Sequence, residues 1–281
     1  MRITKGGISM YATDFEYDGR WLSDYNCIVC DFEDSSGTKV ASAGSSITFN
    51  KITRDYGRKN SLSGIQYDQC ITATFDICKN PEVTEKSDLA FTSDECRDIM
   101  RWLNRGAFYK FRVLYDNSDI DTFFFNASFN VEKIKIAEQV YGFRLTMETD
   151  KPYAYGETEK YTFDIKRTHL LKTFNVKDVS DDVGDTYVNL EITCSASGDL
   201  TIANTTMGIS TYIKDCTMGE VIKIDGENMT IETSLARNIW DNFNFVFPQI
   251  TNSLDNISNG FTFSLPCVVT ISYDPIIKET F

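Results

Sequence analysis

The chain has 281 residues, of which 42% are hydrophobic and 25% charged, a composition ordinary for a soluble globular protein and a length that suits two domains. Its net charge of −13 is shared between its halves, because residues 1–150 carry 18 basic and 23 acidic side chains and residues 151–281 carry 10 and 18. Neither half therefore has the basic surface that binding to nucleic-acid phosphates requires.

The ends and hydrophobic segments of the sequence indicate where the protein folds. The first residues lack the apolar segment of a signal peptide, and no run approaches the roughly 18 apolar residues of a membrane-spanning helix. We therefore expect folding in a cytoplasm, without membrane insertion. The eight cysteines are then expected to be reduced thiols.

The first half is predicted to contain strands around one helix. An early strand is predicted at residues 25–32, and a longer one at 65–77, where apolar and polar residues alternate. Residues 79–88 are polar and aperiodic, which indicates an exposed loop. Three further strands are predicted at 108–115, 121–129 and 139–148, with a turn at 116–119 between the first two.

The helix follows the polar loop. Thr92 is predicted to be its N-cap, with Glu95 completing a capping box, and Gly106 is placed where the helix stops. Trp102 lies to the side of the apolar stripe and is expected to cover a neighbouring strand or a partner. The stripe itself is formed by Cys96, Ile99, Met100 and Leu103.

The second half is predicted to be a β-sandwich or barrel, because it consists of many short strands separated by turns. Residues 151–156 interrupt the strand pattern and are predicted to be a linker between a domain at 1–150 and a domain at 157–281. A short helix near 234–240 is the one helical candidate after the linker. The predicted strands are 161–165, 187–193, 200–203, 209–213, 221–224, 229–232, 243–247, 261–265 and 268–273.

Motifs that carry catalysis or bind metals are not complete in this sequence. Cys27 and Cys30 form a C-x-x-C pair, but no second close Cys or His pair accompanies it, and in a strand the two thiols point to opposite faces. His169 is the only histidine, and no G-x-S-x-G nucleophile elbow is present. We therefore expect no enzyme activity, no metal and no cofactor.

Two acidic alternatives remain open. Residues 178–185 carry four aspartates and a glycine, which allows a calcium site, although they lack the register of an EF-hand loop, so a solvated turn is the simpler interpretation. Paired carboxylates for glycoside hydrolysis meet only in space, and a sequence with 41 acidic residues does not exclude them.

Several segments together resemble the distal tail proteins of long-tailed, non-contractile bacteriophages. In the first half these are Arg54 with Leu62-x-Gly64-x-x-Tyr67 before the long strand, and Arg101-Trp102-Leu103 at the end of the helix. The first half closes with a strand that runs into Asp150-Lys151-Pro152-Tyr153-Ala154. In the second half, residues 200–206 and 219–225 resemble central strands of the family's galectin-like sandwich.

This resemblance implies a mainly β protein with one short helix in a ring-forming N-terminal domain of the α+β or barrel-like kind, followed by a galectin-like β-sandwich. It also implies a hexameric ring, single or as two stacked rings, that joins the tail tube protein to the tail-tip hub protein. Receptor-binding or other tip proteins would dock on it, and DNA would pass through its lumen without specific binding. Such a protein is assembled in the host cytoplasm and resides in the virion at the tail tip.

Aromatic residues are the candidate contact residues, because interfaces concentrate binding energy in aromatic and arginine side chains. An alternative function is carbohydrate binding in host-surface attachment, for which Tyr212 and Trp240 are the candidate platform. The candidate ring-interface anchors are Tyr56, Tyr67, Trp102, Phe108 and Tyr109.

Overall fold

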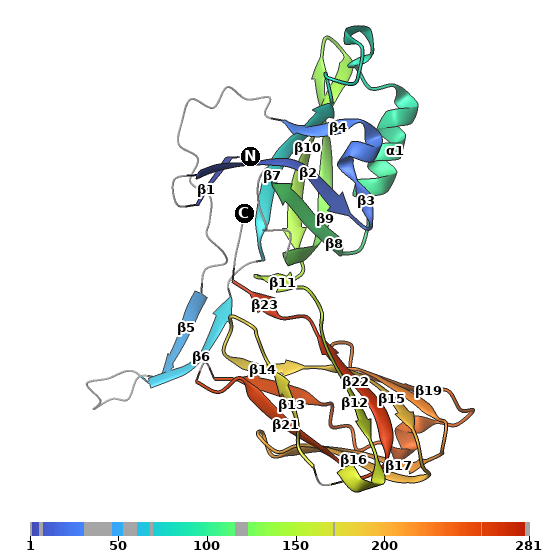
Figure 1. Cartoon of the computed structure of the whole chain (residues 1–281). Helices are drawn as coiled ribbons and strands as arrows, with labels where there is room; N and C mark the ends of the chain where they lie inside the picture. The colour runs from blue at the N-terminus through green and yellow to red at the C-terminus, as the bar shows by residue number, and fades with distance from the viewer. Residues whose placement is uncertain are drawn as a thin grey trace. The chain divides into compact units, whose positions relative to one another are not determined.

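A computed structural model describes residues 2–5, 8–30, 47–52, 61–67, 70–115, 123–170, 172–253 and 255–278. The described residues fall into two units (Figure 1). The N-terminal unit holds those up to Tyr155 together with Lys278, and the C-terminal unit spans Gly156–Ile277.

The N-terminal unit is built on a sheet with the strand order β1–β2–β8–β9–β10–β7–β4, in which all neighbours are antiparallel. β3 (Arg20–Trp21) extends it beside β2, β11 (Ala154–Gly156) lies beside β9, and β5 (Ile47–Ile52) pairs with β6 (Ser61–Tyr67) in a separate hairpin. The strands of the main path are β1 (Arg2–Lys5), β2 (Ile8–Tyr17), β4 (Cys27–Cys30), β7 (Thr72–Lys79), β8 (Tyr109–Tyr115), β9 (Phe123–Ile136) and β10 (Gln139–Thr149).

Helix α1 (Ser93–Leu103) forms where the capping signal predicts it. The Thr92 hydroxyl accepts a hydrogen bond from the Glu95 amide at 3.3 Å, and the Glu95 carboxylate accepts one from the Thr92 amide at 2.7 Å. Both bonds satisfy backbone amides that the start of a helix leaves unpaired. Cys96, Ile99 and Leu103 are buried, as the apolar stripe predicts, and two short 3₁₀ turns, η1 (Leu22–Tyr25) and η2 (Lys86–Asp88), lie elsewhere in the unit.

The C-terminal unit is a sandwich of two antiparallel sheets. The five-stranded sheet has the order β12–β22–β15–β18–β19 and the four-stranded sheet β13–β21–β16–β17, with a separate β14–β20 pair. The strands are β12 (Glu159–Ile165), β13 (Phe174–Lys177), β14 (Gly184–Tyr187), β15 (Asn189–Cys194), β16 (Gly198–Asn204), β17 (Ile209–Cys216), β18 (Val221–Asp225), β19 (Thr230–Thr233), β20 (Gln249–Asn252), β21 (Ser258–Phe263), β22 (Cys267–Tyr273) and β23 (Ile276–Ile277), and the 3₁₀ turns are η3 (Arg167–His169) and η4 (Ile239–Asn242).

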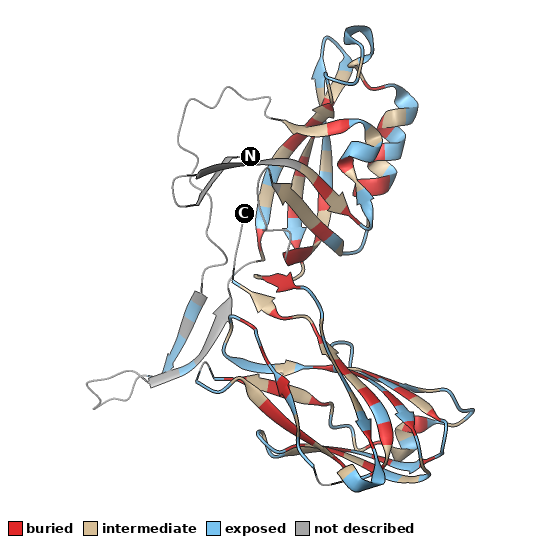
Figure 2. Ribbon diagram, in the orientation of Figure 1, coloured by how far each residue is buried: buried red, intermediate tan, exposed pale blue. Residues whose placement is uncertain are grey.

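A single apolar core joins the two sheets of the sandwich (Figure 2). β15 shows why, because Leu190, Ile192 and Cys194 are buried while the residues between them are exposed, the alternation of a strand with one buried face. Ile202 and Ile213 contribute from the facing sheet. The mainly β class, with one α-helix among the described residues and a C-terminal sandwich, is therefore confirmed.

Several predicted elements differ from the structure. The strand predicted at 65–77 is wrong as one element, because β6 pairs with β5 whereas β7 pairs with β4 and β10. Of the strand predicted at 25–32, residues 27–30 form β4, and residues 31 and 32 lie outside the described residues. The turn predicted at 116–119 also lies outside them. The predicted linker contains β11, in which Ala154 and Tyr155 are buried.

Three further predictions, for a strand, a helix and a helix end, also differ from the structure. No strand forms at 243–247, because Phe245 has a φ of 60° and only an isolated bridge joins Phe243 to Ile213. The helix predicted near 234–240 is limited to the 3₁₀ turn η4. α1 ends at Leu103 with Asn104 as its C-cap, so Gly106 lies beyond the helix end.

Candidate assembly surfaces

The loop before α1 is attached to the helix by a buried lysine. The side chain of Lys79, at the end of β7, is 9% exposed, and its Nζ lies 2.7 Å from a carboxylate oxygen of Glu95. Nζ also donates to the carbonyl oxygens of Asp88 at 3.0 Å and Ala90 at 3.2 Å. Burial opposes ionisation of Glu95, but the bonds from Lys79 and Thr92 outweigh it and lower the pKa of this carboxyl. The loop is thereby fixed against the start of the helix.

The end of α1 is anchored by Trp102, which is 2% exposed. Its ring stacks on Phe15 with centroids 5.7 Å apart and on Tyr25 with centroids 4.5 Å apart. Its Nε1 donates to the Tyr17 carbonyl at 3.0 Å. Stacking on these two rings and the hydrogen bond from Nε1 hold this buried indole in one position. Trp102 therefore fixes the helix on β2 and η1.

An open groove of about 500 Å³ lies beside this anchor. Arg105 pairs with Asp18 at 2.6 Å. Burial alone would lower the pKa of Arg105, but this contact helps to raise it above the ordinary value. Arg101 is 3.8 Å from Asp98 and largely exposed, while Arg20 donates to the Tyr25 hydroxyl at 3.3 Å. The groove is lined by Asp18, Arg20, Tyr25, Asp98, Arg101, Trp102 and Arg105.

The predicted ring anchors are not gathered at one place. Trp102 is buried in its own unit, whereas Phe108 is 48% exposed. Tyr109 is partly covered by Arg105, whose guanidinium lies 4.3 Å from the ring centroid. Tyr67 belongs to β6, but its side chain, like all of Tyr56, lies outside the described residues. Their role at an interface stays a prediction, and the arginines of the groove were not predicted at all.

In the C-terminal unit, a loop after η4 covers the free edge of the four-stranded sheet. Asn244 exchanges backbone and side-chain hydrogen bonds with Tyr212 of β17, and its Nδ2 donates to the Ser210 carbonyl at 3.0 Å. The Thr211 hydroxyl donates to the Val246 carbonyl at 2.8 Å. An open strand edge invites pairing with other chains, and this loop removes that edge from solvent.

The same loop presents an aromatic ring to solvent. Phe245 is 65% exposed, its φ is 60°, and its ring stacks on Trp240 with centroids 5.6 Å apart. A left-handed conformation at a bulky residue is strained, and such strain persists where the surroundings over-determine it. Tyr212 is 47% exposed, but one face of Trp240 is occupied by Phe245, so the carbohydrate platform of these two residues stays a prediction. Alternating aromatics at 243, 245 and 247 imitate a strand, which is why Phe245 was missed.

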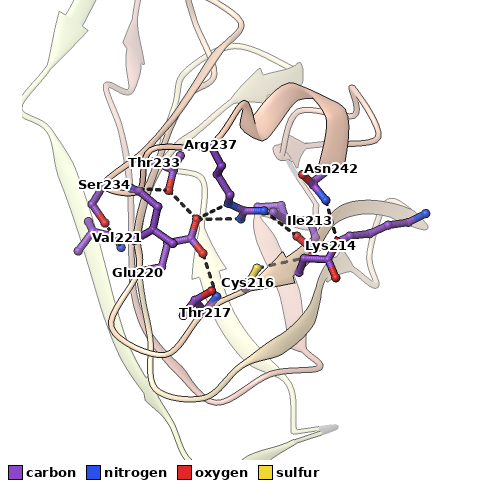
Figure 3. Close-up of polar contacts among 12 residues, drawn as sticks. Ile213, Lys214, Cys216, Thr217, Glu220, Val221, Thr233, Ser234, Arg237 and Asn242 are labelled. Atoms are coloured by element: carbon purple, nitrogen blue, oxygen red, sulfur yellow. Dashed lines mark hydrogen bonds and ion pairs between the residues drawn. The ribbon is translucent and has the colours of Figure 1, made fainter.

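A buried ion pair holds the segment that leads into this loop (Figure 3). The carboxylate of Glu220 is fully buried and accepts hydrogen bonds from Arg237 Nε at 2.9 Å and the Thr233 hydroxyl at 2.5 Å on one oxygen, and from the Thr217 amide at 2.9 Å on the other. Arg237 continues to the Lys214 carbonyl at 3.1 Å. The network therefore connects β17, β19 and the start of β18 through the buried carboxylate of Glu220.

This network predicts a pH dependence for the C-terminal unit. Burial opposes ionisation of Glu220, but its hydrogen bonds from Thr233, Thr217 and Arg237 outweigh burial and lower its pKa. Because the folded pKa is depressed, the stabilisation is present above the unfolded value of roughly 4.3 and is lost as pH falls toward the folded value. We expect the difference in the free energy of unfolding between wild type and Glu220→Gln, measured in urea, to be constant from neutral pH to about pH 5 and to shrink below it. A difference that grows on acidification would contradict this assignment.

The structure also places the other polar residues that the sequence singled out. In the part of the chain that the structure describes, no group of three or more His, Cys, Asp or Glu residues is arranged to hold a metal ion. All eight cysteines are free thiols. His169 lies in η3 and is partly buried, with Nδ1 3.3 Å from the Asp164 carbonyl. Asp178 is buried and accepts a hydrogen bond from the Ser180 amide within its own turn.

Comparisons with known proteins place the chain in a family. Residues 10–151 match the family described as "Phage tail protein N-terminal domain", and residues 153–273 match "Phage tail C-terminal domain". The chain belongs to this phage tail protein family. No curated protein matches its sequence. Among the described residues, none of the helices has the length and hydrophobicity that a bilayer crossing requires.

Solved structures agree with this family at the level of the fold. The Dit protein (gp 19.1) of phage SPP1 matches with a TM-score of 0.61 and 11% identity, over 94% of this chain and 99% of that chain. A chain of the phage p2 baseplate in its activated conformation matches with a TM-score of 0.50 and 10% identity, over 94% and 98%. The resemblance to distal tail proteins is therefore confirmed at the level of the fold, and the family shows that the chain is a structural protein of the phage tail.

Proposed function

We propose that this phage tail protein is a distal tail adaptor, whose N-terminal units close into a ring between the tail tube and the tail-tip hub. The observation that carries the proposal is a likeness to SPP1 Dit that extends over both units and nearly the whole of each chain. That protein is described as a paradigm of the hub adsorption apparatus in phages that infect Gram-positive bacteria. The ring has a lumen through which DNA passes, and the net charge of −13 suits a wall that does not retain it.

The C-terminal unit is the docking part in this proposal. Its exposed Phe245 is held in a strained conformation on a loop that is hydrogen-bonded to β17. The phenyl side chain is therefore already ordered, and a partner that binds it loses no free energy in ordering it. Exposed aromatic residues on a rigid frame are typical contacts for another protein. We expect this loop to contact a hub or receptor-binding protein of the tail tip.

Light scattering across a concentration series tests the ring. We expect an assembly of six or twelve times 32.0 kDa, because a head-to-tail interface that returns on itself gives a closed species of one size. The Phe245→Ala variant should keep the mass of the wild type, since its loop belongs to the docking unit. A chain that stays at 32.0 kDa throughout, or that grows without a limiting size, would contradict self-assembly into a ring.

A further inference from the structure

The two ends of α1 carry complementary surfaces. Figure 1 shows the loop before α1 at its upper end and β3, with Arg20, at its lower end. The helix has 11 residues, so these surfaces lie on the order of 16 Å apart along it. One surface is the arginine-lined groove, and the other is an acidic knob formed by residues 80–88.

The knob is ordered by Asn80. The side-chain oxygen of Asn80 accepts a hydrogen bond from the Glu82 amide at 2.9 Å, and its backbone carbonyl accepts from the Val83 amide at 3.3 Å and the Thr84 amide at 3.0 Å. Val83 is 67% exposed. Glu82 and Glu85 on either side of it are exposed, and neither carboxylate has an ion pair or hydrogen bond with any residue in the described ranges. Although Lys86 is close by in sequence, the knob presents an apolar side chain between two unpaired acids.

The groove presents the complementary arrangement. One face of the half-buried Tyr25 ring is covered by Trp102. Arg20 and Arg101 line the groove together with this ring pair, and both are exposed. Within the described ranges Arg20 has no ion pair, and Arg101 lies 3.8 Å from Asp98. In a chain with a net charge of −13, two weakly paired arginines beside an aromatic surface are a specific match for an acidic segment with an apolar centre.

We propose that the groove of one copy of this protein receives the Glu82–Val83–Thr84–Glu85 segment of the acidic knob of the next copy. The contact joins different surfaces of identical chains, so it is head-to-tail and leaves a free knob at one end and a free groove at the other end of an open chain of copies. Those ends meet when the assembly closes. This contact rests on the proposed ring and names the residues that form its interface.

Charge reversal tests the contact. We expect Arg20→Glu/Arg101→Glu and Glu82→Arg/Glu85→Arg each to weaken self-assembly at least about 100-fold, because like charges then face each other. An equimolar mixture of the two variants should regain the mass of the wild-type assembly, since the reversed groove of one variant fits the reversed knob of the other, and their unreversed surfaces fit each other. The chain with all four substitutions should also assemble alone.

The control and the outcomes separate the two proposals. Glu191→Lys/Lys223→Glu reverses an exposed pair of the C-terminal unit, 3.8 Å apart, and should leave the assembly unchanged. Urea unfolding of every variant checks the fold, as the substituted side chains are exposed. If the wild type assembles and the reversed variants do so equally well, or if the mixture stays monomeric, the groove–knob contact is overturned alone. A wild type that never assembles overturns the ring, and this contact with it.

Discussion

Replacing Glu220 by glutamine is expected to lower the free energy of unfolding of the C-terminal unit by about 3 kcal/mol, because breaking a buried ion pair leaves an uncompensated charge. Arg237 would keep its position beside a neutral amide. Glutamine also has one acceptor oxygen where the carboxylate has two, so its NH2 group must face either the Thr217 amide or the Arg237 guanidinium, and both of these are donors. Urea unfolding followed by circular dichroism measures the change.

Glu191→Gln is the matched control for this substitution. Glu191 and Lys223 form a pair at 3.8 Å with side chains that are 60% and 62% exposed, so removing the charge should change the free energy of unfolding by less than about 0.5 kcal/mol. Equal losses for Glu220→Gln and Glu191→Gln would show that burial of the Glu220 carboxylate does not determine its contribution.

Replacing Trp102 by alanine is expected to lower the free energy of unfolding of the N-terminal unit by about 3–5 kcal/mol, the usual cost of truncating a buried aromatic residue to alanine. The substitution removes the surface on which Phe15 and Tyr25 stack and leaves the Tyr17 carbonyl without its donor. Amide hydrogen exchange measured by mass spectrometry separates the units, and peptides from α1 should exchange faster while peptides from β15 do not.

Two variants calibrate this result. Trp102→Phe keeps a ring between Phe15 and Tyr25 and loses only part of the volume and the Nε1 bond, so its effect should be intermediate. Phe108→Ala removes a ring that is 48% exposed and should cost less than about 1 kcal/mol. If Trp102→Ala leaves exchange in α1 unchanged but abolishes assembly, Trp102 acts at an interface and not in the core.

Prediction succeeded where the determining contacts are local. The start of α1 depends on Thr92 and Glu95, three residues apart, so the capping box could be read directly. The alternation of β15 likewise reports its buried face without knowledge of its partner. By contrast, residues 243–247 alternate like a strand, but the bonds of Asn244 to Tyr212, 32 residues away, impose another conformation.

The candidate surfaces were largely unpredictable for the same reason. Arg20 and Arg101 are 81 positions apart in the sequence and line one groove only because Trp102 holds the end of α1 on β2. In the sequence, each of these arginines is indistinguishable from an ordinary exposed charged residue. The apparent strand at 243–247 predicted a different environment for Phe245. Its exposure follows from a positive φ, which the residue types around it do not predict.

Periodicity, capping and family motifs are properties of neighbouring residues, so the mainly β class, the capped helix and the phage tail family could be predicted before the fold was known. Which charges are buried in pairs and which remain exposed could be learned only from the folded chain. Glu220 and Arg237 are 17 residues apart, and Asp76 and Arg144 are 68 apart on β7 and β10. Burial and pairing depend on the folded positions of distant segments, and these set the energy of a charge.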